Sequence, residues 1–202
     1  MHKKCIALKC RMQYRRLVKV GMMTKKRDYQ SNTCNNMGPA WDAVKIDTDW
    51  EDKENIRGST STAKIRLCAM YSEEPVDEKK AETYGVCRMM LSETPCSEQD
   101  GFKFEGVTPG GDSDGDIGQY EHDPALYLCV SYNGCEGRGG DNIADPLPAL
   151  AKIGLARNDE QKCPKDMRSG RLISTRGGAT GDFNQNMWSG GDVWMCEERA
   201  KK

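Results

Sequence analysis

The sequence predicts an all-β protein built from three successive modules, and three observations lead to this prediction. A closing segment recurs three times, the cysteines recur at nearly constant spacing, and the composition is poor in large apolar residues. Leu, Ile, Val and Phe make up about 14% of the 202 residues, beside 21 Gly and 10 Cys. Such a composition would indicate disorder only together with a high net charge, and the net charge is −1. A loop-rich β protein stiffened by cross-links is therefore expected.

The first element is a basic arm that we assign to residues 1–16. Residues 1–27 contain ten Lys and Arg and no acid. Two interpretations of this segment stay open. It is either a solvated terminus that leads into a strand from Leu17 to Met22, or a helix that lies on an anionic membrane surface.

The repeated segments close on Cys68, Cys129 and Cys196. The residues three and one positions before each cysteine are apolar: Ile65 and Leu67, Leu126 and Leu128, Val193 and Met195. Successive side chains of a strand point to opposite faces, so these six are expected in a core while the cysteines point outward. The three modules span approximately residues 17–71, 84–132 and 151–199.

Each closing cysteine has another cysteine 33 or 34 residues upstream. This spacing predicts three disulfides: Cys34–Cys68, Cys96–Cys129 and Cys163–Cys196. Loops of this length would each contribute roughly 3 to 4 kcal/mol to stability. Four cysteines remain unassigned: Cys5, Cys10, Cys87 and Cys135. The alternative is a cytosolic protein with ten reduced, buried thiols.

The third module carries a family resemblance. Its segments "CPKDM", "GDFNQ" and "SGGDVWMC" resemble the Cys-Pro, Asp-x-Asn and Gly-Gly-strand pattern of β-prism modules. The closest are the multivesicular-body-associated β-prism domain and related modules attached to membrane-attack-complex/perforin proteins. The vitelline membrane outer layer proteins are a second, looser match.

This resemblance implies a three-repeat β-prism over residues 17–202, with small antiparallel sheets around a pseudo-threefold axis. It also implies a non-enzymatic, lectin-like function in which the module binds an anionic lipid membrane or glycans. The module would then be the targeting domain of a larger pore-forming or membrane-associated chain. The alternative is a disulfide-rich structural protein of an extracellular coat.

A single metal site is a candidate, at Asp112, Asp114 and Asp116. Alternating aspartates supply oxygen ligands as a calcium loop does, but Ile117 stands where such a loop needs glycine. The alternative is an acidic, solvated turn. We expect no other cofactor.

Catalysis and nucleic-acid binding are not expected. The only histidines are His2 and His122, and no nucleophile is placed beside either. A glycine-rich phosphate loop with its lysine is missing from the sequence, and two isolated Arg-Gly-Gly segments are too few to indicate RNA binding.

The expected location is secreted or membrane-associated. The even number of cysteines favours oxidation, and no apolar run approaches the 18 residues of a membrane span. The first ten residues do not resemble a signal peptide, so we expect the chain to be a fragment whose leader lies elsewhere.

The predicted membrane-binding residues lie in and before the last loop. Met187 and Trp188 sit at an apolar tip among glycines, and four upstream cations would attract anionic lipid: Lys165, Arg168, Arg171 and Arg176. A tryptophan beside glycine can instead fold back over a thin core, and both interpretations stay open.

Replacing the tryptophan distinguishes these interpretations. If the ring enters the headgroup region, Trp188→Ala weakens co-sedimentation with anionic liposomes and leaves the melting temperature nearly unchanged. A large fall in melting temperature, or unchanged lipid binding, would identify the ring as structural.

Overall fold

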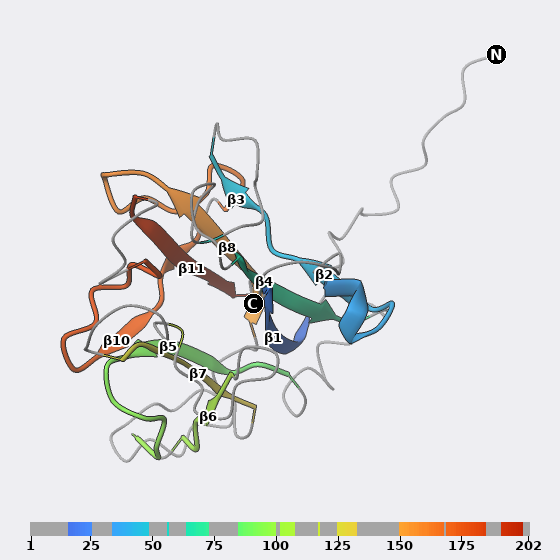
Figure 1. Cartoon of the computed structure of the whole chain (residues 1–202), viewed down its shortest axis with the longest axis horizontal. Helices are drawn as coiled ribbons and strands as arrows, with labels where there is room; N and C mark the ends of the chain where they lie inside the picture. Colours follow the sequence, from blue (N-terminus) through green and yellow to red (C-terminus); the bar gives the residue numbers. More distant parts are fainter. Residues whose placement is uncertain are drawn as a thin grey trace, which may run out of the picture.

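The computed structural model describes residues 16–25, 34–48, 56, 64–72, 85–99, 102–107, 117, 125–132, 150–167, 169–184 and 191–199. In these ranges the chain forms eleven strands and one short 3-10 helix, η1 (Cys34–Met37), with no α-helix (Figure 1). The prediction of an all-β protein is confirmed. None of the helical structure in the described residues is long and apolar enough to cross a membrane.

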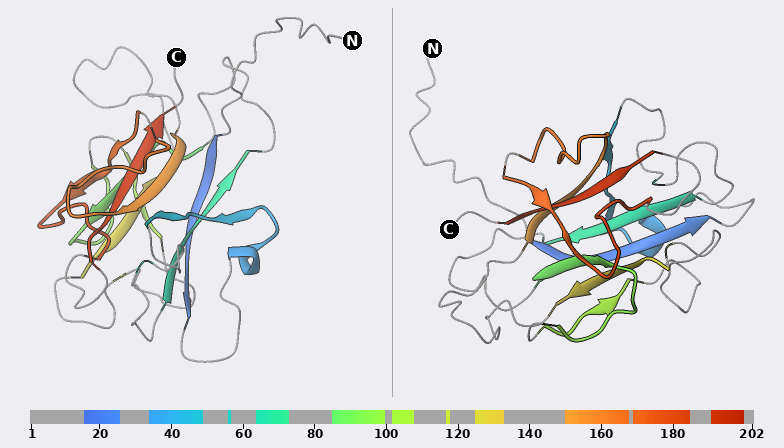
Figure 2. Two further views of the ribbon diagram at one scale, coloured as in Figure 1. Left: turned by 90° about the horizontal axis from the view of Figure 1, so that it is seen from above. Right: turned by 90° about the vertical axis from the view of Figure 1, so that its left-hand side faces the viewer.

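The strands form three small sheets. The first sheet has the order β1 (Leu17–Lys25), β4 (Lys64–Tyr71), β2 (Trp41–Ala43). The second sheet has the order β10 (Ser174–Arg176), β5 (Arg88–Ser92), β7 (Tyr127–Ser131), β6 (Glu105–Gly106). The third sheet has the order β3 (Ile46–Asp47), β8 (Leu150–Arg157), β11 (Val193–Arg199), β9 (Arg171–Leu172). In the right-hand view of Figure 2 the blue and teal strands of the first sheet lie between the orange–red and the green–yellow strands, whereas in the left-hand view they lie to one side of both.

Two strands pair with a strand of a different module. β3 follows β2 in the chain but pairs in parallel with β8, with Ile46 opposite Leu155. β10 follows β9 and pairs in parallel with β5, with Ser174 opposite Met90. All other pairings between named strands are antiparallel. The first module therefore supplies an edge to the third sheet, and the third module supplies an edge to the second sheet.

The inner faces of all three sheets contribute to one hydrophobic core. The six apolar residues predicted there are all buried in it. Before each closing segment, a buried residue donates its backbone N–H to the carbonyl one position before the cysteine. These bonds are Val44 to Leu67 (2.9 Å), Val107 to Leu128 (2.8 Å) and Ile173 to Met195 (3.0 Å). The three modules thus enter the core through equivalent residues.

The second module differs from a simple strand alternation. Phe102 and Phe104 do not enter the common core, because they pack on the outer face of the second sheet with Met90 and Cys129. The guanidinium of Arg88 lies 4.0 Å from the ring centroid of Phe102. In this module the two phenylalanines therefore cover the Cys96–Cys129 disulfide and do not contribute to the common core.

The three predicted disulfides are confirmed. Cys34–Cys68, Cys96–Cys129 and Cys163–Cys196 join Cα atoms 5.6, 5.5 and 5.7 Å apart. The closing cysteines point outward as expected, yet each is fully buried, because the loop that carries its partner lies over it. Cys87 is also disulfide-bonded.

Two glycines make room for the outer loops. Gly21 and Gly154 stand opposite Cys68 and Cys196 in the strand pairing. A Cβ on Gly154 would lie 2.4 Å from Met167 Sδ and 2.9 Å from Pro164 Cγ, which is too close for any side chain. The absence of a side chain on β8 therefore lets the disulfide loop lie against the sheet.

Gly154→Ala is expected to lower the free energy of unfolding by about 1–3 kcal/mol, because the added methyl group forces Met167 and Pro164 away. Gly106→Ala is the matched control, since its Cβ would meet only Cys96 Sγ at an ordinary 3.7 Å. Urea unfolding of both variants with disulfides intact gives the comparison. Equal stabilities would show that the outer loop yields freely.

Candidate functional site

A pocket of about 380 Å³ lies at the corner between the first and third sheets. β2 forms one side of the pocket, and the crossover into β3 forms a second side. The third side is formed by β8 together with the loop after Cys163. Three lysines and three aspartates line it: Lys45, Lys152, Lys165, Asp42, Asp47 and Asp166. The other lining residues are Ala43, Val44, Ile46, Ala69, Tyr71, Ile153, Gly154 and Pro164. Its volume falls within the range of small-ligand sites.

The charges of the pocket are balanced and partly paired. Lys152 Nζ forms an ion pair with Asp166 Oδ2. The backbone N–H of Lys165 donates to Asp47 Oδ2 at 3.0 Å, which ties the disulfide loop to the crossover strand. Asp42 on β2 and Lys45 on the crossover into β3 are exposed. The pocket thus presents carboxylate acceptors and ammonium donors together, with no excess of either charge.

Tyr71 connects the pocket to the core. Its hydroxyl is hydrogen-bonded to the backbone of Ile153, so a residue of the first sheet contacts the third sheet. Burial raises the pKa of Tyr71, and the nearby charge of Asp42 adds to the rise, although the bond to Ile153 opposes it. The phenol consequently stays neutral at physiological pH and can act as a hydrogen-bonding group.

The predicted membrane-binding cations lie in different places. Lys165 is on the rim of the pocket, whereas Arg171 is on β9, at the opposite edge of the third sheet from β3. Arg171 donates from Nε and from a terminal nitrogen to Glu197 Oε1, at 3.0 and 2.8 Å. The described cations therefore do not form one basic patch around Lys165.

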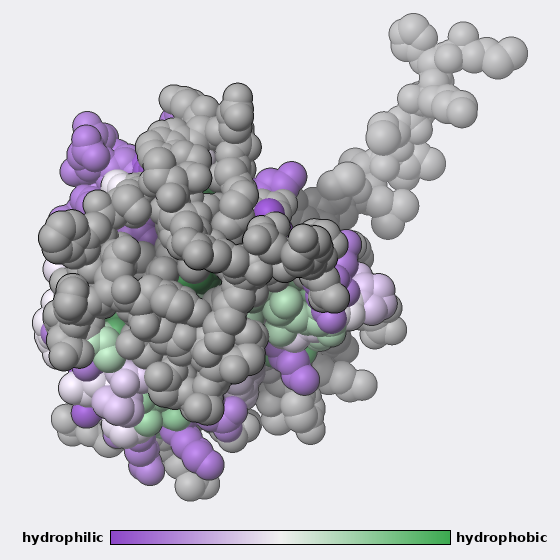
Figure 3. All heavy atoms as spheres, viewed as in Figure 1, coloured by the Kyte–Doolittle hydropathy of each residue, from purple (hydrophilic) through white to green (hydrophobic). Residues whose placement is uncertain are grey.

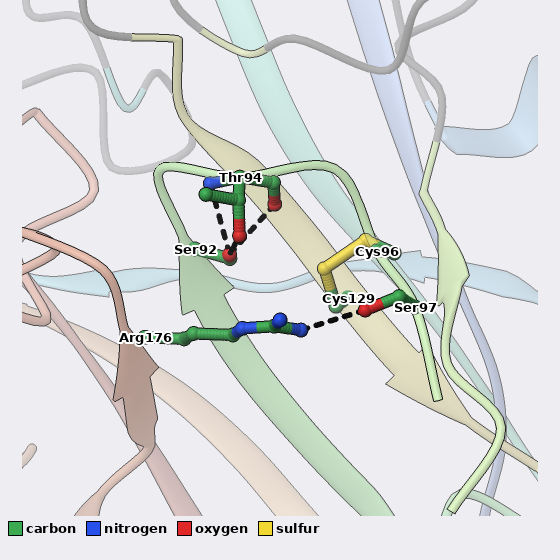
Figure 4. The surroundings of a disulfide bond; sticks show 6 residues. All are labelled: Ser92, Thr94, Cys96, Ser97, Cys129 and Arg176. Carbon is green, nitrogen blue, oxygen red and sulfur yellow. Dashed lines mark hydrogen bonds between the residues drawn. A yellow bond between two sulfur atoms is a disulfide. The ribbon is translucent and has the colours of Figure 1, made fainter. Parts of the chain in front are cut away.

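Arg176 is placed in the second sheet by β10. It donates to Ser97 Oγ at 2.7 Å, beside the Cys96–Cys129 disulfide (Figure 4). This bond joins the third module to the cysteine loop of the second. Arg176 thus has a structural contact, and its predicted membrane-binding role stays a prediction.

The remaining predicted residues lie outside the described ranges. These are Arg168, Met187 and Trp188 of the membrane hypothesis and Asp112, Asp114 and Asp116 of the metal hypothesis. Within the ranges given above, no three His, Cys, Asp or Glu side chains are grouped as metal ligands. Among the coloured residues of the face in Figure 3, hydrophilic side chains outnumber the small hydrophobic areas between them. Met37 of η1 is 37% exposed.

The Asp-Asn turn of the third module has a structural role. Asp182 Oδ1 accepts the backbone N–H groups of Asn184 (2.9 Å) and Val193 (2.7 Å). Asn184 Nδ2 donates to the carbonyls of Ile56 (2.8 Å) and Gly191 (2.9 Å). Since Ile56 belongs to the first module, the turn both starts β11 and joins two modules.

The pocket residues other than Lys165 were not identified from the sequence. Asp42 and Tyr71 come from the first module, while Lys152 comes from the third, so no local motif brings them together. One signal was available: Tyr71 and Tyr132 each follow their closing cysteine by three positions.

No protein-family model matches the chain, and a search of curated proteins found no similar one. The resemblance to β-prism modules therefore stays a prediction.

Asp182 makes stability depend on pH. Burial raises the pKa of its carboxyl more than the two N–H donors lower it. Its charged form therefore destabilises the native state above the folded pKa, and this cost disappears as the pH falls below the unfolded value near ~3.9. Asp182→Asn keeps the oxygen acceptor without the charge, so it should be more stable than the wild type at pH 7. Urea unfolding should show this difference in the free energy of unfolding shrink as the pH falls to 3.

Asp182→Ala is the companion variant. It leaves the N–H groups of Asn184 and Val193 without their acceptor, so a loss of about 1–3 kcal/mol per group is expected at any pH. A constant difference between wild type and Asp182→Asn across the pH range would contradict the titration.

Proposed function

We propose that the protein is a non-enzymatic β-prism module that binds glycans at the pocket between the first and third sheets. Three features support the prism architecture: the shared core, the equivalent backbone bonds of the three modules and the two parallel crossovers. In this proposal the sheets surround a pseudo-threefold axis, and the modules are residues 17–71, 84–132 and 151–199.

The balanced lining of the pocket is the observation that favours a glycan. Each sugar hydroxyl donates one hydrogen bond and accepts others, so a saccharide site needs acceptors and donors close together, which carboxylates and ammonium groups can provide. The exposed Asp42 and Lys45 provide a carboxylate and an ammonium group in this lining, and Tyr71 and Ile153 contribute apolar surface to it. An anionic lipid headgroup would instead need an excess of positive charge.

The described basic residues favour this choice over a lipid surface. Arg171 and Arg176 are engaged with Glu197 and Ser97, and Lys165 lies beside Asp47 and Asp166. Three disulfides are compatible with an extracellular protein, where glycans are abundant. A secreted or membrane-associated location is part of the proposal.

Asp42→Asn tests the site. Loss of a charged hydrogen bond, about 1.5–3 kcal/mol, should weaken saccharide binding roughly tenfold or more on an array of neutral and acidic oligosaccharides. Asp159→Asn, an exposed turn residue outside the pocket lining, is the matched control and should bind as the wild type does.

Two outcomes would overturn the proposal: wild-type protein that binds no saccharide on the array, or an Asp42→Asn variant that binds as tightly as the wild type. Binding to phosphatidylserine vesicles without saccharide binding would favour the membrane hypothesis. Strong self-association without either ligand would favour the structural coat protein.

A further inference from the structure

The corner between the second and first sheets repeats the side chains of the pocket. Glu105 pairs with the residue one position after Cys129, as Asp42 pairs with the residue one position after Cys68. Both acids are exposed, and each lies on the second strand of its module in chain order, β2 or β6. Tyr132 follows Cys129 by three positions, as Tyr71 follows Cys68.

The neighbouring sheet supplies equivalent residues at both corners. At the pocket, Lys152 pairs with the residue two positions after Cys196, and Gly154 pairs with Cys196 itself. In the first sheet, Lys19 and Gly21 hold the same two positions relative to Cys68. The set of carboxylate, tyrosine, lysine and glycine therefore occurs twice.

The contacts within the two sets agree as well. The Tyr132 hydroxyl donates to the Val20 carbonyl at 3.3 Å and accepts from its N–H at 3.4 Å, as the Tyr71 hydroxyl bonds to the backbone of Ile153. Each tyrosine has its pKa raised by burial and, further, by its own carboxylate neighbour. Both tyrosines thus join one sheet to the next beside an exposed acid.

The third corner departs from this pattern. Arg171 stands where the other modules have an acid, and Arg199 stands in the tyrosine position. Arg199 donates to Glu197 Oε1 (3.4 Å) and to the Cys87 carbonyl (2.9 Å), while Arg171 binds the same carboxylate. Because these charges pair with one another, and arginines replace both the acid and the tyrosine, the third corner lacks the exposed acid beside a tyrosine that the other two corners have.

We propose that the corner formed by Glu105, Tyr132, Lys19 and Gly21 is a second saccharide site, so that one chain binds two copies of the same neutral glycan. This inference rests on the proposed function of the first pocket. Two sites on one rigid scaffold allow the chain to cross-link glycans on a surface and to gain avidity.

Calorimetric stoichiometry tests the inference. Chitotetraose, mannotetraose and cellotetraose are titrated separately into the full chain, and the tightest binder is used for the variants. Two equivalents of equal affinity are expected for the wild type. One equivalent of that affinity is expected for Asp42→Asn and for Glu105→Gln, because each substitution weakens its own site roughly tenfold or more, and none of that affinity for the double variant. Glu98→Gln, another exposed acid of the second module, is the control and should retain two.

The outcomes separate the two proposals. One equivalent in the wild type, lost in Asp42→Asn and retained in Glu105→Gln, would overturn the second site and leave the first intact. No heat with any of the three saccharides, together with no binding on the array, would overturn the proposed function itself. Lys19→Gln gives a second variant of the same corner and should also reduce the stoichiometry to one.

Discussion

The structure depends on the parallel pairing of an edge strand from one module with the first strand of another. β3 reaches β8, and β10 reaches β5, so the sheets are completed by residues from distant parts of the chain. Side-chain hydrogen bonds join the same pairs of sheets as these strands do. Tyr71 of the first sheet bonds to the third sheet, and Arg199 of the third sheet bonds to the Cys87 carbonyl next to the second sheet. Because each sheet is held by its neighbour, none needs a large apolar face of its own.

This arrangement explains the unusual composition. A three- or four-stranded sheet buries too little surface to be stable alone, but three sheets facing one another share a single core. In the described residues, the disulfide loops cover the outer faces of these sheets. Trp194 shows how thoroughly they are covered: it lies on the outer face yet is 4% exposed, with its indole nitrogen donating to the Asn158 carbonyl at 2.7 Å.

Local patterns predicted the local features well. The alternation before each closing cysteine identified core residues, and the cysteine spacing identified the three disulfides, because both depend on residues within one module. The crossovers were not predictable in this way, since β3 and β10 are two and three residues long and carry no alternation of their own. The pocket depends on the crossover of β3, so most of its residues were missed for the same reason. Ile173 fills the core, whereas Leu172 pairs with the outward-pointing Cys196 on the other face of the sheet.

The crossover of β3 has a consequence for how the chain folds as it is synthesised. Ile46 leaves the ribosome long before Leu155, its partner 109 positions later, so the first module emerges with an edge that has nothing to pair with. Contacts of such sequence separation form slowly, and an unpaired edge is prone to associate with other chains. Nascent protein would therefore depend on rapid completion of the third module, or on a chaperone that shields this edge, before the native structure closes.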